Sequence, residues 1–259
     1  MRGNLLYLDK GSGLHQLHPL SKLAFTFFFL ICAAALPGLD WLLAAYFFLL
    51  LPLAGWGQVT APFLRSSWAV ITPFVISLSL IQGFFTGCET VLFSLGRFAF
   101  TFEGWLAGLT VAARILVALG GALLLTLTTR PDALMQALTQ RGLPNSLAYI
   151  VLSSIQIFPR FQDRAQLILQ AQQARGLETG GNLVRRLKLL VPLSGPLILS
   201  SIVDVEERAM ALEARGFSRP GRKTSLLVLR DSQAQRLLRF VLLLLGLGLI
   251  TLRVWTLFQ

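Results

Sequence analysis

The chain has 259 residues, of which 54% are hydrophobic and only 14% are charged, and its formal net charge is +11. A soluble domain of this length carries about a quarter charged residues, so too few polar side chains remain here to cover a water-facing surface. This composition excludes an ordinary soluble domain and indicates an integral membrane protein, in which an excess of Lys and Arg more often reflects topology than nucleic-acid binding.

Five stretches are apolar and long enough to cross about 30 Å of hydrocarbon, which takes about 20 residues of helix. They cover approximately residues 22–38, 41–57, 67–85, 104–127 and 237–258. Pro52 and Gly55 are expected to break the end of the second stretch, and Pro73 lies inside the third. Between the third and fourth, Val91–Leu95 and Phe98–Phe102 are expected to form a short helix in the membrane interface.

The positive charges predict the orientation. Residues 128–235 hold 14 of the 23 Lys and Arg residues, which places this long segment in the cytoplasm. Arg2, Lys10 and Lys22 place the N-terminus on the same side of the membrane. The 14 positive charges of the segment are interleaved with eight carboxylates, so no uninterrupted basic stripe results and nucleic acid is not expected as a partner.

The sequence therefore predicts an all-α integral membrane protein in three parts. Residues 1–127 form a membrane domain of four spans, residues 128–235 a helical cytoplasmic segment, and residues 236–259 a C-terminal transmembrane helix. A sixth span over residues 189–203 is the alternative. Two prolines and a glycine interrupt that run, and a lone extra span would move part of the basic segment outside, so a helix buried against the membrane face is preferred.

Prolines and glycines divide the cytoplasmic segment into helices. The expected helices cover Asp132–Gln140, Leu147–Ile157, Arg160–Arg175, Arg185–Leu190 and Leu197–Arg215. Pro131 stands at the first position of the first of these helices, and Gly142 lies just past its end. Pro159 is expected to interrupt the chain between the second and the third.

A repeated tripeptide is the most informative motif. Ala174-Arg175-Gly176 and Ala214-Arg215-Gly216 are 40 residues apart, and each ends an amphipathic helix. Each glycine can adopt the left-handed conformation that closes a helix, and each arginine then lies where the helix dipole favours a cation. One such ending is ordinary, but two on the same segment favour a function. A guanidinium at a helix tip can bind a carboxylate in a partner's groove with two hydrogen bonds.

Several further segments occur in an order that resembles a known family. They are HPLSKL (His18–Leu23), FTFEGWLAGLTVAARIL (Phe100–Leu116), TTRPDALMQALTQRGLP (Thr128–Pro144), IFPRFQDRAQLILQAQQARG (Ile157–Gly176) and ALEARGF (Ala211–Phe217). Together they resemble the T component of energy-coupling factor (ECF) importers for vitamins and metals, over most of the chain. The paired Ala-Arg-Gly motifs are the specific part of the resemblance. His18 departs from it, because the family often has Asp at this place.

The resemblance implies a membrane scaffold that is not an enzyme and needs no cofactor. It implies two ABC-type ATPase subunits in the cytoplasm and a small substrate-binding S component in the membrane. By the same resemblance, Arg175 and Arg215 are the ATPase-coupling residues, and ATP-driven movement of their helices reorients the S component. The implied location is the plasma membrane of a prokaryote, which the chain crosses several times in contact with lipid.

Other functional motifs are weaker. Gly216–Thr224 nearly spells a phosphate-binding loop, but it has one residue too many and follows a helix where a strand is needed. His15 and His18 are three residues apart and lack a third ligand, so no metal site is expected. Arg114 lies deep in the fourth span, where a charge is costly, and a structural or functional role in the bundle interior is predicted.

Other classes of protein fit the sequence less well. An integral membrane enzyme should offer His, Asp or Glu clustered at the membrane face, but both histidines of this chain lie near the N-terminus. An ordinary ABC permease couples through a single motif, whereas this chain carries two. An integral membrane enzyme, or another membrane protein whose cytoplasmic segment docks a partner, remains the alternative.

Overall fold

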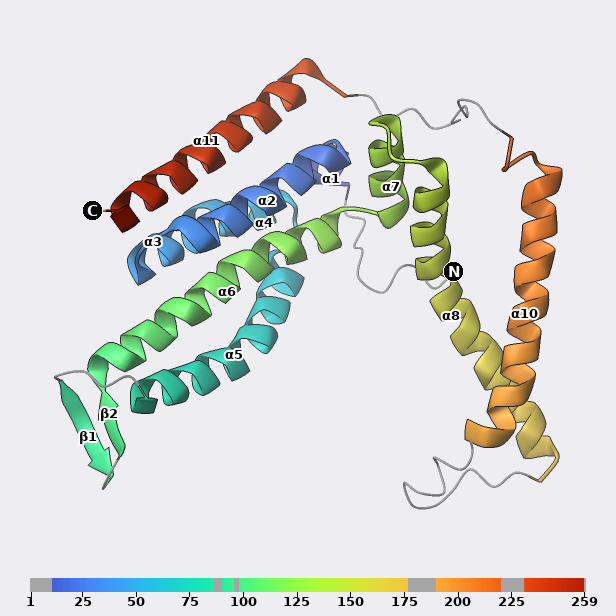
Figure 1. Cartoon of the computed structure of the whole chain (residues 1–259), viewed down its shortest axis with the longest axis horizontal. Coiled ribbons are helices and arrows are strands. Elements are labelled where there is room, and N and C mark those ends of the chain that lie inside the picture. The colour runs from blue at the N-terminus through green and yellow to red at the C-terminus, as the bar shows by residue number, and fades with distance from the viewer. Residues whose placement is uncertain (1–10, 86–89, 96–97, 177–189, 220–230, 259) are drawn as a thin grey trace. The chain divides into compact units, whose positions relative to one another are not determined.

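The computed structural model describes residues 11–85, 90–95, 98–176, 190–219 and 231–258 (Figure 1). They divide into two compact units. The first, called the membrane unit, consists of Met1–Arg141 and Leu229–Gln259. The second, called the α8–α10 unit after its two helices, consists of Gly142–Val228.

The membrane unit is built from helices and one β-hairpin. Its helices are α1 (Gly13–Gln16), α2 (Pro19–Ala35), α3 (Leu39–Ala44), the π-helical turn η1 (Ala45–Leu50), α4 (Leu51–Trp56), α5 (Thr60–Phe85), α6 (Phe102–Thr128), α7 (Pro131–Gln140) and α11 (Gln233–Phe258). Helix α11 packs on α2, α2 packs on α6, and α6 packs on α5 (Figure 1).

Four helical stretches in the described part of the chain are long and apolar enough to cross a membrane. They cover Leu39–Trp56, Thr60–Phe85, Phe102–Thr128 and Gln233–Thr256. The predicted first span corresponds to α2, which is apolar but shorter, at 17 residues. The structure thus has the all-α membrane architecture that the composition predicts.

The second stretch does not break at Pro52, contrary to the prediction. Helices α3 and α4 join through η1 into one stretch that continues past Pro52 to Trp56. A π-helical turn widens the backbone by one residue, and here it ends at Leu50, two residues before the proline. The proline then stands in the first turn of α4, where its missing N–H is tolerated.

The connection between α5 and α6 contains a hairpin, so the predicted interfacial helix is wrong. Strands β1 (Val91–Leu95) and β2 (Phe98–Thr101) pair antiparallel, with Leu95 opposite Phe98. Short apolar runs rich in Val and Phe suit a strand as well as a helix, and here the cross-strand pairing decides. The Phe100 ring lies 5.3 Å from that of Phe84, which anchors the hairpin on the end of α5.

Small residues let α5 and α6 approach closely. A Cβ atom on Gly104 would clash with the Gln82 carbonyl oxygen, and one on Gly108 would lie 2.8 Å from that of Leu78. These two glycines are one turn apart and share a face of α6, a pattern that is common where membrane helices pack. The contact between α5 and α6 therefore depends on the absence of side chains at both positions.

The core of the membrane unit lies between α2, the second span, α5 and α6. Its fully buried members include Phe29, Leu42, Leu50, Phe63 and Val117. Large apolar side chains such as Phe48, Trp68 and Leu247 are instead exposed on the outer faces of the helices. Exposed side chains of this kind are expected where lipid surrounds a membrane protein.

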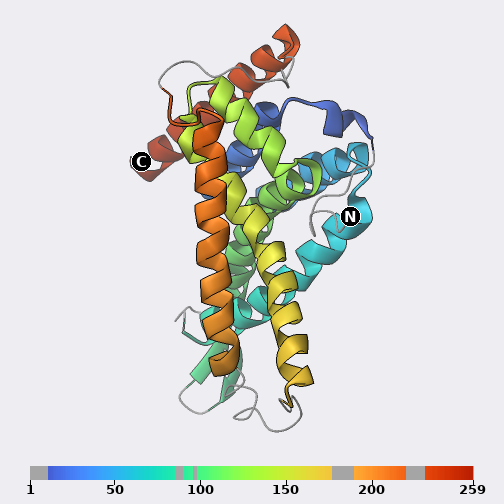
Figure 2. The same ribbon diagram turned by 90° about the vertical axis from the view of Figure 1, so that its right-hand side faces the viewer.

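The α8–α10 unit contains two long helices, α8 (Asn145–Ala174) and α10 (Leu190–Ala214), which lie against each other (Figure 2). Pro159 lies inside α8, so the two helices predicted on either side of it form one helix. The side chains around Pro159 are exposed, so water can hydrogen-bond the carbonyl that the proline leaves free.

Helix α10 likewise starts at Leu190 and includes Pro196, earlier than the predicted start at Leu197. It is not among the four stretches suited to cross a membrane in the described residues, so a sixth span is not supported. Its apolar side chains Ile198, Leu199 and Ile202 are exposed on the α8–α10 unit, and the burial of this run against the membrane face stays a prediction. The expected helix over Arg185–Leu190 lies almost wholly outside the described residues.

Candidate functional site

The first repeated motif closes α8. Ala174 is the last residue of the helix, and Arg175 and Gly176 follow it with exposed side chains and backbone. Gly176 has φ +92°, and its N–H donates to the Gln173 carbonyl at 2.9 Å. The left-handed glycine predicted from the sequence is confirmed, and Arg175 is exposed at the helix tip.

The second motif closes α10 in the same way. Gly216, after the exposed Ala214 and Arg215, has φ +73° and donates its N–H to the Glu213 carbonyl at 2.8 Å. The Phe217 N–H donates to the Leu212 carbonyl at 2.9 Å. This pair of bonds is a Schellman motif, which satisfies the last carbonyls of the helix.

An ion pair joins the two helices at positions that are equivalent in the 40-residue repeat. The Arg164 Nη1 lies 2.6 Å from the Asp204 Oδ2 and also donates to the Ser200 carbonyl at 3.1 Å. Arg164 stands eleven residues before Arg175, and Asp204 stands eleven residues before Arg215. The two residues of the ion pair are therefore 40 residues apart, as are the two arginines at the helix tips.

The two helices run antiparallel. The Tyr149 ring, near the start of α8, lies 5.2 Å from that of Phe217, just past the end of α10. Arg175 and Arg215 consequently point to opposite ends of the unit. At 1.5 Å per residue, each arginine lies about 16 Å along its helix from the ion pair.

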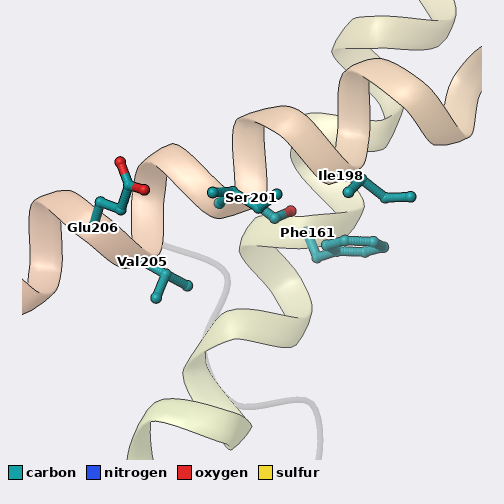
Figure 3. A pocket seen from close by; sticks show the side chains of 6 residues that line it. Phe161, Ile198, Ser201, Val205 and Glu206 are labelled. Atoms are coloured by element: carbon teal, nitrogen blue, oxygen red, sulfur yellow. The ribbon is translucent and has the colours of Figure 1, made fainter.

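A shallow apolar groove of about 490 Å³ lies where the two helices cross (Figure 3). Its lining residues are Phe161, Ile198, Ser201, Ile202, Val205 and Glu206. One carboxylate and one hydroxyl are thus the only polar side chains on an otherwise apolar lining. Such a surface can pack against an apolar partner but offers no cluster of groups for catalysis.

Arg114 extends from α6 to the end of α2. Its Nη2 lies 3.5 Å from the carbonyl oxygen of Leu36, the residue that caps α2. A cation at a helix C-terminus is favoured by the helix dipole, although this contact is long. The Nε is buried and has no hydrogen-bond partner among the described residues. The predicted structural role for Arg114 is thus a proposal that this contact supports.

The two histidines have separate local contacts. His15 Nδ1 is 2.7 Å from the Ser12 hydroxyl oxygen, and His18 Nδ1 accepts from the Leu20 N–H at 3.3 Å. No group of three potential metal ligands occurs in the part of the chain that the structure describes. The His18 side chain is the N-cap of α2, an acceptor role that an aspartate would also perform.

A cluster around Asp231 was not anticipated from the sequence. Its carboxylate contacts three arginines: Arg141 at 3.0 Å, Arg236 at 3.3 Å and Arg239 at 2.6 Å. The sequence offered one local signal, which is an acid just before the positively charged first turns of α11. The partner on α7 is 90 residues away and left no such signal.

The fold and the paired helix ends define a polytopic membrane protein with a separate unit of two antiparallel helices. The family model described as cobalt transport protein, CbiQ, matches residues 10–226. The chain therefore belongs to the CbiQ family.

Curated relatives carry a more specific name. The chain is 29% identical over 258 residues to the energy-coupling factor transporter transmembrane protein EcfT of Streptococcus equi subsp. equi, covering 95% of each chain. It is 31% identical over 234 residues to the EcfT protein of Listeria innocua, covering 86% of this chain and 88% of that one. The EcfT protein of Heliobacterium modesticaldum is 31% identical over 218 residues, or 81% of each chain. All three are named as transporter components, not as enzymes.

Proposed function

We propose that this chain is the transmembrane component of an ECF-type importer for a vitamin or a transition metal. In this role it is a scaffold in a prokaryotic plasma membrane, with its N-terminus in the cytoplasm. It transmits the movement of two ATPase subunits to an S component that binds the substrate. The family membership and the names of the relatives support the proposal at the level of the whole protein.

The observation that carries the proposal is the placement of Arg175 and Arg215. Both are exposed, both directly follow a helix, and they lie at opposite ends of two antiparallel helices. Each guanidinium can enter a groove on one ATPase subunit and bind a carboxylate with two hydrogen bonds. Two equivalent tips facing apart suit two similar subunits, one for each tip.

The ion pair between Arg164 and Asp204 supports the same proposal. It fixes the two helices at positions that the 40-residue repeat relates, so the two arms that end in arginine have equal length. Two similar ATPase subunits that move together would then act on Arg175 and Arg215 at equal distances along the helices from the ion pair.

The apolar groove supports a second partner. An apolar lining with a single carboxylate suits a hydrophobic helical protein, and in this proposal the S component occupies it. The S component would also select the cargo. A phosphate-binding loop follows a strand, whereas Gly216, the first glycine of the near-match, ends helix α10. In this proposal ATP is therefore bound and hydrolysed by the ATPase subunits.

Co-purification tests the coupling role. Arg175→Glu with Arg215→Glu should abolish transport and weaken capture of the ATPase subunits by the tagged chain, because a carboxylate would repel the acid that the arginine binds. Arg160→Glu and Arg219→Glu are matched controls, since both residues are exposed, one within α8 and one just after α10. An intact, transport-competent complex with both motif arginines reversed would contradict the assignment.

A further inference from the structure

Asp231 lies at the point where the chain returns to the membrane unit, two residues before α11. Arg141 lies at the point where the chain leaves that unit, directly after α7. The Arg141 Nη2 donates to the Asp231 Oδ2 at 3.0 Å. One ion pair therefore joins the two chain ends of the whole α8–α10 unit.

Arg239 holds the carboxylate in place for this contact. Its Nη2 donates to both oxygens of Asp231, at 2.6 and 2.7 Å, and both side chains are only 12% exposed. Arg141 is more accessible, with 57% of its side chain exposed. The contact between Arg239 and Asp231 is thus a mostly buried ion pair within one segment of the chain. Arg141 adds a contact between segments that are 90 residues apart.

The carboxylate is ionised at neutral pH. Burial alone would raise the pKa of Asp231, but the hydrogen bond and charge of Arg239, the hydrogen bond of Arg141 and the charge of His18 outweigh burial. The pKa consequently lies below its ordinary value. The carboxylate therefore carries the negative charge that the contact with Arg141 needs.

Hydrogen bonds near Asp231 also connect the adjoining ends of α2, α6 and α11. The His18 N–H donates to the Gln235 Oε1 at 3.2 Å, which joins the start of α2 to the start of α11. The Lys22 ammonium donates to the Thr128 carbonyl at 2.7 Å, which joins α2 to the end of α6. A displacement of Arg141 or Asp231 is thus passed directly to three membrane helices.

The connection between Arg141 and α8 is short. Three residues, Gly142, Leu143 and Pro144, separate Arg141 from the first residue of α8. Gly142 has φ +108°, which favours glycine, and Pro144 has a fixed backbone angle of its own. The covalent route from α8 to Arg141 is therefore only three residues long.

We propose that Arg141 and Asp231 act as a clasp that makes coupling efficient. With the clasp closed, movement that the ATPases impose on α8 and α10 is delivered to α2, α6 and α11. With the clasp open, part of that movement separates the two chain ends, and ATP is hydrolysed without transport. Arg141 is in this sense a positioning residue, and its role rests on the proposed function.

Arg236 offers a matched control for the experiment. It contacts the same Asp231 oxygen at 3.3 Å and is 63% exposed, close to the 57% of Arg141. It differs in one respect, because it belongs to α11, the same segment as Asp231. Loss of Arg236 removes a similar charge contact but leaves the two chain ends joined.

The complete complex, reconstituted in liposomes, is measured for substrate transported per ATP hydrolysed. Arg141→Gln should lower this ratio about two- to fivefold, the change in an equilibrium expected for loss of an exposed ion pair. Arg236→Gln should leave it unchanged, and Arg141→Lys, which keeps the charge, should restore most of it. An unchanged ratio in Arg141→Gln, or an equal fall in Arg236→Gln, would overturn the clasp.

Two further measurements separate the clasp from the proposed function. The amount of ATPase that co-purifies should be the same for Arg141→Gln and for the unaltered chain. If the unaltered chain binds no ATPase, the proposed function is contradicted, whereas the clasp is tested separately by hydrogen exchange. Amide hydrogen exchange on the full chain should be faster at the end of α7 in Arg141→Gln but not in Arg236→Gln. Equal exchange in the two variants would contradict the clasp even without any partner.

Discussion

Arg164 of α8 and Asp204 of α10 form an ion pair 2.6 Å long, and each stands eleven residues before an Ala-Arg-Gly arginine. The crossing of the two helices and their two tips thus share one repeat of the sequence. The pair is partly exposed, with 40% and 34% of the side chains accessible, so its net energy is that of a surface ion pair.

Removing either partner of this pair should loosen the crossing by a small amount. Arg164→Gln or Asp204→Asn is expected to lower the stability of the two-helix contact by about 0.5–1 kcal/mol. The exchanged double variant, Arg164→Asp with Asp204→Arg, should recover part of the loss. Thermal unfolding of the purified chain in a double-mutant cycle gives the coupling energy, and strictly additive effects would show that the pair contributes nothing.

Substitution of Gly216 should weaken the end of α10. An alanine has no steric clash there, since nothing lies within 4 Å of its Cβ position, but φ +73° strains any ordinary side chain. Gly216→Ala should therefore cost about 1 kcal/mol, and Gly216→Asn less, because Asn tolerates this conformation. Helix content and thermal unfolding would report the change.

Gly195 is the matched control for this effect. It lies inside α10, its Cβ position is equally open, and its φ is not positive. Gly195→Ala should stabilise the helix by up to about 1 kcal/mol because alanine has the higher helix propensity. The same direction of change at both glycines would contradict the explanation from backbone conformation.

Gly108→Ala should disturb the packing of α5 on α6. Its new Cβ would lie 2.8 Å from the Leu78 carbonyl oxygen, which is backbone and cannot move aside cheaply. Overpacking of this kind costs about 1–3 kcal/mol, so the variant should express poorly or unfold at a lower temperature. Gly248→Ala in α11, where nothing lies within 4 Å, should behave like the unaltered chain.

His18 should make stability depend on pH. Burial lowers the pKa of His18 below 6.5, and the charges of Arg239 and Arg141 lower it further, while Asp231 opposes them. Because the folded pKa is depressed, the stabilising contribution is complete above about pH 6.5 and is lost as the pH falls through the lowered pKa. Protonation also removes the acceptor that caps α2.

His18→Asn tests this prediction, since Asn keeps a capping oxygen but does not titrate. Between pH 7 and pH 5, the melting temperature of the unaltered chain should fall more than that of the variant. Asp231 does not titrate in this range, because its pKa lies below 3.8. Parallel pH profiles for the two proteins would assign the effect to another group.

The features that the sequence predicted well are local ones. The apolar stretches locate the membrane helices because hydropathy acts residue by residue along a span. The left-handed glycines at 176 and 216 were predicted correctly because helix endings depend on a few adjacent residues. The orientation of the chain, the coupling role of the two arginines and the bounds of the three predicted parts stay predictions.

The features that were missed depend on contacts between distant segments. The hairpin of Val91–Leu95 and Phe98–Thr101 forms through cross-strand pairing, and its short apolar runs suit a helix equally well. Helix α8 continues through Pro159, where the neighbouring side chains are exposed and water can hydrogen-bond the carbonyl that the proline leaves free. The contact between Arg141 and Asp231 has no trace in either neighbourhood of the sequence.

The short first span affects the surrounding bilayer. With 17 residues, α2 rises about 26 Å, less than the roughly 30 Å of an average hydrocarbon layer. Helices α5 and α6, with 26 and 27 residues, rise about 40 Å and must tilt to fit the same layer. If α2 crosses the membrane as predicted, acyl chains beside it must shorten or disorder to match its length.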